Sequence, residues 1–143
     1  MREAARWLLA AFLLFAGTGH LMDTESFLAQ VPPFLPAPEV IVIVSGLIEL
    51  ALGAAVAVTR GRWRRLTGWL VAAWFVAIFP GNISQFLTGA DAFGLDSDAA
   101  RAVRLLFQPL LVIWALWSTG AWRAWRDPAT DALGGSRGEH TST

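Results

Sequence analysis

The sequence contains no cysteine, no lysine and no tyrosine. Because cysteine is absent, disulfide bonds, thiolate metal sites and dithiol redox chemistry are excluded within this chain. All 11 basic residues are arginine, and 11 acidic residues balance them to a formal net charge of +0. This balance gives no indication of a polyanion-binding surface, so we expect no nucleic-acid partner.

Apolar residues are abundant and are gathered in long runs. They make up 55% of the chain, and the mean hydropathy is +0.51. Runs at about 4–22, 39–59, 66–87 and 99–121 are each long enough, at roughly 1.5 Å per residue, to cross a hydrocarbon core of ~30 Å. The alternative is a buried bundle of a soluble protein, but its helices would keep polar faces, and these runs are apolar nearly all round. The pattern predicts an all-α integral membrane four-helix bundle.

We expect residues 1–126 to form one four-helix transmembrane domain. Residues 127–143 are rich in glycine, serine, threonine and charge, which predicts a disordered cytoplasmic tail. The first run resembles a secretory signal peptide because Arg2 and Arg6 precede it. No small-x-small cleavage site stands out before His20, so we interpret this run as the first transmembrane helix.

A proline-rich segment, residues 23–38, separates the first two runs. Asp23 or Thr24 could cap a short helix reaching to Gln30. Prolines at positions 32, 33, 36 and 38 then prevent any long helix. Because the segment is also apolar, we expect it to lie in the membrane interface as a lid.

Charged residues predict how the chain is oriented in the membrane. One side of the four runs carries Arg2, Arg6, Arg60, Arg62, Arg64, Arg65, Arg123 and Arg126. The other side carries Asp23, Glu25, Glu39, Asp91, Asp96 and Asp98, opposed by Arg101. Arginine accumulates on the cytoplasmic side of membranes. We therefore predict a multi-pass protein of the plasma (cell) membrane with both termini cytoplasmic (N-in, C-in) and the proline-rich loop extracytoplasmic.

Polar residues inside a membrane are costly and usually functional or paired. The residues of this kind are His20, Ser45, Glu49, Asn82, Arg104 and Gln108. The helical rise places all of them in the outer half or at the midplane, although they come from different runs. Within a run, the spacing of Ser45 to Glu49 and of Arg104 to Gln108 puts each pair on one helix face. We predict that the six line one ligand-binding pocket that opens to the outer side.

Arg104 is the natural counter-charge for Glu49, and we expect Gln108 between them. Two interpretations of this pair stay open: a part of the ligand site, or a structural ion pair that fixes the helix register. Pro80 and Pro109 each leave a backbone carbonyl without its helical donor near the polar residues. Such breaks are tolerated at membrane depth where they line a cavity or are buried in protein.

Small residues predict where two helices approach closely. Gly46 and Gly53 are seven residues apart in the second run, which gives that helix a smooth surface.

Several short motifs together resemble the DoxX-like family of small four-helix membrane proteins. They are Gly17 with His20, Val31-Pro32-Pro33 with Leu35-Pro36, Ser45-Gly46 with Glu49, Phe79-Pro80-Gly81-Asn82-Ile83, and Arg104 to Gln108-Pro109. The resemblance covers roughly residues 5–126. It implies a four-helix membrane fold and, because some relatives belong to membrane redox systems, a link to quinone chemistry. A thiol role does not carry over, since cysteine is absent.

Three functions remain open. The first is a pocket that binds an amphipathic ligand such as a quinone or a lipid. The second is a non-catalytic accessory or assembly subunit, held to a membrane protein partner or to copies of itself. The third is a small proton-coupled exporter that uses Glu49, although a carboxylate paired with Arg104 suits that role poorly.

Independent catalytic activity is not expected. The membrane runs contain no Ser-His-Asp grouping and no helical metal motif, so we predict no catalytic residue and no metal. We predict no haem either, because His140 lies in the tail and leaves His20 without a second histidine. Only acid–base isomerisation of a lipid by Glu49 and His20 stays conceivable.

Overall fold

The computed structural model describes residues 1–90 and 97–126. This part of the chain is helical and holds no strand, as predicted. Its helices are α1 (Arg2–Met22), α2 (Thr24–Leu28), α3 (Pro38–Val58), α4 (Gly61–Ala77), α5 (Phe79–Thr88), α6 (Asp98–Thr119) and α7 (Ala121–Arg126). The predicted disordered tail, 127–143, lies outside the described residues, as do Asp91 and Asp96 of the predicted outer loop.

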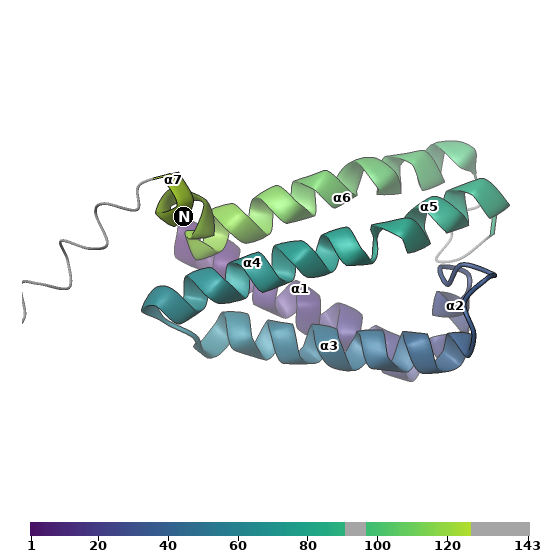
Figure 1. The fold of residues 1–143 in the computed structure, drawn as a ribbon, viewed down its shortest axis with the longest axis horizontal. Helices are drawn as coiled ribbons and strands as arrows, with labels where there is room; N and C mark the ends of the chain where they lie inside the picture. The colour runs from purple at the N-terminus through teal and green to yellow at the C-terminus, as the bar shows by residue number, and fades with distance from the viewer. Residues whose placement is uncertain (91–96, 127–143) are drawn as a thin grey trace, which may run out of the picture.

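Four candidate membrane spans lie alongside one another in an elongated bundle (Figure 1). They are α1, α3, α4 together with α5, and α6, and each is long and apolar enough to cross a membrane. The third span begins at Gly61, earlier than the predicted start near residue 66. Hydropathy alone misses this first turn because it is rich in arginine, which is nevertheless a good helix former.

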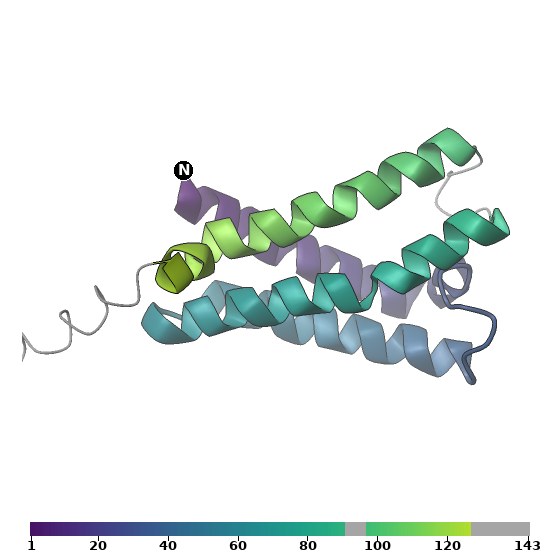
Figure 2. The ribbon, with the colours of Figure 1, turned by 45° about the horizontal axis from the view of Figure 1, so that its top comes forward.

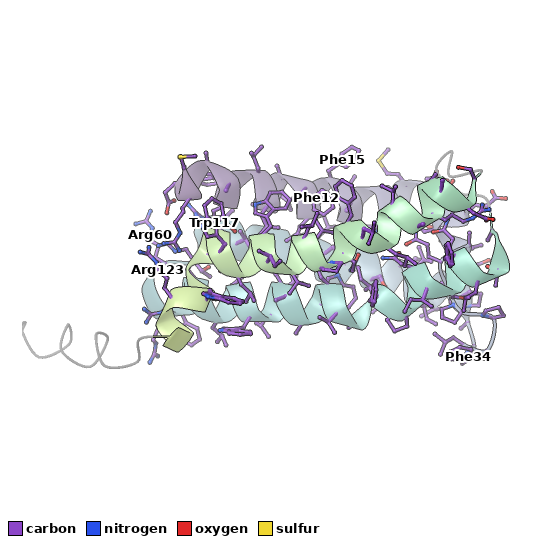
Figure 3. The ribbon with its side chains drawn as sticks, turned by 90° about the horizontal axis from the view of Figure 1, so that it is seen from above. Phe12, Phe15, Phe34, Arg60, Trp117 and Arg123 are labelled. Carbon is purple, nitrogen blue, oxygen red and sulfur yellow. The ribbon has the colours of Figure 1, made fainter. Side chains whose placement is uncertain are left out.

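The bundle exposes large apolar side chains and buries few. Phe15 is 81% exposed and points away from the bundle in Figure 3. The interior between α1, α3, α4 and α6 is filled by a small set that includes Leu9, Leu13, Val71 and Phe75. An apolar exterior of this kind is suited to lipid rather than to water.

Glycines bring α1 and α3 into close contact. A Cβ atom added at Gly46 would lie 2.7 Å from the Cβ of His20, and one added at Gly53 would lie 2.9 Å from the Cγ of Leu14. Real Cβ atoms do not approach other atoms so closely, so the two backbones meet only because these positions lack side chains. The predicted smooth surface at Gly46 and Gly53 is confirmed.

The third span is broken at Ile78, which separates α4 from α5. Pro80 lies in the first turn of α5, where its missing N–H costs little. Figure 2 shows α5 continuing at an angle to α4, so that α5 and α6 diverge from α3 toward the end that carries α2. The predicted break at Pro80 is confirmed, whereas α6 continues through Pro109.

The segment between α1 and α3 contains one short helix, as predicted. The Asp23 side chain accepts a hydrogen bond from the backbone N–H of Ser26 and caps α2. The helix ends at Leu28, slightly earlier than the expected Gln30. The rest of the segment is irregular and lies at the end where α5 and α6 diverge (Figure 1).

Candidate functional site

A cavity of about 630 Å³ occupies the space between the diverging helices. Side chains from α1 to α6 and from the proline-rich loop line it, and most of them are apolar or aromatic. All of the predicted site residues lie in its wall: His20, Ser45, Glu49, Asn82, Arg104 and Gln108. The structure therefore brings together side chains that are up to 88 positions apart in sequence (108 minus 20).

Glu49 is the acidic residue among the described residues of the cavity wall, and 4% of its surface is exposed. It lies on α3, one turn after Ser45, which is half-buried and also faces the cavity. The indole Nε1 of Trp74 donates a hydrogen bond to Oε1 of Glu49 at 3.3 Å. Its second oxygen, Oε2, lies 3.3 Å from Nδ1 of His20.

The expected pairing of Glu49 with Arg104 is wrong. Among the described residues, the ionisable side chain beside Glu49 is His20 from α1, and its Nδ1 lies 3.3 Å from Oε2 of Glu49. The close approach of α1 and α3 at Gly46 explains the difference, because it places His20 directly beside the Glu49 face. Arg104 enters the cavity wall from α6 and engages other residues.

His20 is held in a defined orientation. Its Nδ1 lies 2.9 Å from the carbonyl oxygen of Ala16, one turn earlier on α1. A carbonyl oxygen can only accept, so we assign the hydrogen to Nδ1. The ring also stacks against Phe27 of α2, with centroids 3.8 Å apart. This stacking joins the short helix of the loop to the cavity wall.

Arg104 links the loop to the diverging helices. Its Nη2 donates to Oε1 of Gln30 at 2.7 Å, and its Nη1 donates to Oε1 of Gln85 at 3.1 Å. Neither glutamine was predicted as part of the site. Gln85 follows Asn82 by three residues, so the helical spacing could have indicated that both share one face. Gln30 lies in an irregular loop, and no periodicity points to it.

Gln108 and Asn82 form a polar contact between α6 and α5. The Asn82 Nδ2 donates to Oε1 of Gln108 at 2.9 Å. Gln108 in turn donates from Nε2 to the backbone carbonyl of Phe75, close to the break between α4 and α5. Gln108 was predicted to lie between Glu49 and Arg104. In the structure its side chain instead reaches the break between α4 and α5, where it donates to a buried backbone oxygen that would otherwise lack a partner.

The arrangement can bind a ligand that is mostly apolar and carries polar atoms at one end. Aromatic and aliphatic side chains supply the greater part of the wall, whereas N–H donors and a carboxyl group occur at a few positions. Within residues 1–90 and 97–126, no group of three or more histidine, aspartate or glutamate side chains could hold a metal ion.

A comparison with protein families gives a match over most of the chain. Residues 9–119 match the family model described as "Domain of unknown function (DUF8561)". No curated protein and no solved structure matches the chain. The resemblance to the DoxX-like family stays a prediction.

Proposed function

The chain belongs to the family described as a domain of unknown function (DUF8561), and we propose that it binds an amphipathic small molecule, a quinone or a lipid, in its intramembrane cavity. One observation carries this proposal: polar side chains from all four spans line a single cavity of about 630 Å³. Pockets that hold small molecules are typically about 300–1,000 Å³ and combine apolar walls with few polar groups.

The bound molecule would place its polar head among the N–H groups of the cavity wall. Arg104 and Gln30 are hydrogen-bonded to each other in this wall, and so are Asn82 and Gln108. Arginine and amide N–H groups are the donors that carbonyl oxygens require. Flat side chains such as Trp74 and Phe75 would contact a ring, so the residues present fit a quinone head group.

The loop between α1 and α3 would cover the entrance to the cavity. Val31, Pro32 and Leu35 of this loop line the cavity, and the contact between Gln30 and Arg104 holds the loop against α6. We place this end toward the extracytoplasmic side of the plasma membrane, because the arginine-rich loops lie at the opposite end. An apolar tail could then leave the cavity between the helices into lipid.

The chain would act by binding rather than by turnover of its own. If it belongs to a membrane redox system, the ligand would supply the redox chemistry, and the protein would supply orientation and charge. A partner protein, or a second copy of the chain, would receive the ligand from the cavity.

Binding of a short-chain quinone to the protein in lipid nanodiscs tests the proposal. Trp74 and Trp114 line the cavity, so quenching of tryptophan fluorescence reports occupancy. We expect saturable quenching in the wild type. In Arg104→Ala, the loss of a charged hydrogen-bond donor should weaken binding roughly tenfold, or about 1.4 kcal/mol.

Arg62→Ala is the matched control. Arg62 is exposed at the start of α4, at the end of the bundle away from the cavity. Its removal should leave the affinity unchanged. Equal affinities for wild type and Arg104→Ala would contradict the proposed site.

A further inference from the structure

The arginines at the end of the bundle that carries the N-terminus divide into two groups. The first group serves the fold. Arg2 donates from Nε to the backbone carbonyl of Trp117 at 3.0 Å, and Arg64 donates from Nη1 to Oε1 of Glu3 at 2.6 Å. Arg6 is buried, and its guanidinium group donates to Glu3 as well. Protein atoms therefore already bind the charges of this first group.

The second group is exposed and forms what we call the arginine face: Arg60, Arg62 and Arg123. Arg60 and Arg123 lie at the same end of the molecule in Figure 3. Within residues 1–90 and 97–126, Glu3 is the acidic side chain at this end, and two arginines of the first group already bind it. No carboxylate in these two ranges pairs with the arginine face. Its positive charges are therefore available to a partner outside this part of the chain.

The turn at Gly120 brings α7, and with it Arg123, against α4. Gly120 has a φ of +81°, a left-handed conformation that glycine adopts without strain. After this turn, α7 packs against α4 at the end of the bundle that carries the N-terminus (Figure 1). Ala121 is fully buried there. The fold therefore gathers the arginine face from two helices in contact, together with Arg60, the residue that caps α4.

Exposed tryptophans indicate that this end of the molecule lies at a membrane surface. The indole rings that are 42% to 56% exposed are Trp7, Trp63, Trp69, Trp117 and Trp122. Tryptophan is enriched at the level of the lipid head groups. Arg62 adjoins Trp63 and Arg123 adjoins Trp122, so the arginine face lies at that level too. A lipid surface is thereby favoured as the partner over a soluble acidic protein.

We propose that the arginine face binds phospholipids with a net negative charge and prefers them to zwitterionic phospholipids with the same acyl chains. Both classes carry a phosphate group, but a zwitterionic head adds a cation that the guanidinium groups repel. Each arginine close to a membrane surface adds to the attraction for anionic lipid. The face lies at the opposite end of the bundle from the cavity, so this inference does not rest on the proposed function.

Quenching of tryptophan fluorescence by brominated lipids tests this preference. The protein is placed in nanodiscs of equimolar phosphatidylcholine and phosphatidylglycerol, and one of the two lipids is brominated high in its acyl chains. The surface charge is then the same in both samples. Bromine quenches the indoles that it contacts, and the exposed indoles lie near the arginine face. The ratio of the two quenching signals, corrected for empty nanodiscs, gives the local enrichment of the anionic lipid.

We expect the wild type to enrich the anionic lipid at least about threefold at low salt. The enrichment should fall toward one in about 1 M salt, where charges are screened over about 3 Å. In Arg60→Gln/Arg123→Gln it should drop to less than half of the wild-type value. Arg60→Lys/Arg123→Lys should keep it, because the charge remains. Arg62 is left in place, since its contact with the ring of Trp63 at 4.8 Å affects the fluorescence.

Glu25→Gln/Glu39→Gln is the matched control. Both glutamates are exposed at the opposite end, and their replacement changes the net charge by the same amount with the opposite sign. The enrichment should stay unchanged in this variant, because it is measured at the arginine face.

The wild-type and salt measurements need no variant to fold, so they are decisive by themselves. Equal quenching by the two brominated lipids in the wild type would overturn the proposal and would leave an acidic protein segment as the partner. An enrichment that high salt leaves intact, or that Arg60→Gln/Arg123→Gln retains, would also overturn it.

Discussion

Arg6 is a buried charged residue at the end of the bundle opposite the cavity. Its Nη1 donates to the carbonyl oxygens of Val56 at 2.6 Å and Ala57 at 3.0 Å, in the last turn of α3. These carbonyls belong to the turn that lacks donors within its own helix. Glu3 accepts from the other side of the guanidinium, which gives Arg6 a counter-charge, and it also accepts from Arg64. A single side chain from α1 thereby caps α3.

Replacing Arg6 with methionine should lower the free energy of unfolding by about 1–3 kcal/mol, because the buried carbonyl of Val56 and the part-buried carbonyl of Ala57 lose their donor. The measurement is the midpoint of an SDS unfolding titration in mixed micelles. Arg62→Met is the control, since Arg62 is exposed and its contact is with the ring of Trp63 at 4.8 Å. It should shift the stability by less than about 0.5 kcal/mol. Equal midpoints for the two variants would show that the capping contacts of Arg6 contribute nothing.

The sequence predicts which residues meet in the cavity better than it predicts their partners. Depth along each span and the spacing of Ser45 to Glu49 depend only on the helical rise and pitch, so convergence could be predicted. The partner of Glu49 depends on which helix lies against α3. The spacing of polar and apolar residues in the sequence does not determine which helices are neighbours. The role of Gln30 depends on the path of an irregular loop, which carries no periodic signal.

At the scale of helices, the contact between α1 and α3 positions the acidic side of the cavity. Gly17 and Gly46 face each other, and a Cβ at Gly17 would lie 2.7 Å from the carbonyl oxygen of Gly46. The same approach sets His20 against Glu49 at 3.3 Å. The geometry of this pair is therefore a consequence of how closely two backbones pack, rather than of the two side chains alone.

Gly46→Ala should push α1 away from α3 and separate His20 from Glu49. We expect a loss of about 1–3 kcal/mol of stability from the overpacked contact and weaker ligand binding in the nanodisc assay. Gly19→Ala is the control, because a Cβ there would lie 3.5 Å from the ring of Phe27, an ordinary contact. Both substitutions gain similar helix propensity, about 1 kcal/mol, so their difference reports the packing. Similar stability and binding of both variants would refute the role of Gly46.

The two prolines within the spans show what the sequence could and could not predict about the helices. Both were expected to interrupt a helix, but only Pro80 marks a boundary. Gly81 follows Pro80 and lets the Gln30 carbonyl approach, since a Cβ there would lie 2.7 Å from that oxygen. Pro109 has no glycine beside it, and α6 continues through it. Hydrophobic run length predicted the four spans; the local effect of each proline depended on what packs against it.

The two ends of the whole molecule differ in chemistry. Figure 3 shows Arg60 and Arg123 at one end and Phe34 at the other. The cavity and the proline-rich loop lie toward the end that carries Phe34, whereas Glu3, Arg6 and their hydrogen bonds lie toward the end that carries the arginines. The orientation in the membrane would therefore decide which compartment supplies the proposed ligand, and the excess of arginine favours a cavity that faces outward.

Labelling of single cysteines tests this orientation without background, because the natural chain has no cysteine. Phe34 is 82% exposed in the loop, and Arg62 is exposed in the first turn of the third span. We expect a membrane-impermeant maleimide to label Phe34→Cys in intact cells and Arg62→Cys only after the membrane is opened, since arginine-rich loops remain cytoplasmic. A permeant maleimide that labels both variants shows that each thiol is reactive. The reverse pattern would turn the cavity toward the cytoplasm, and the ligand would then have to come from that side.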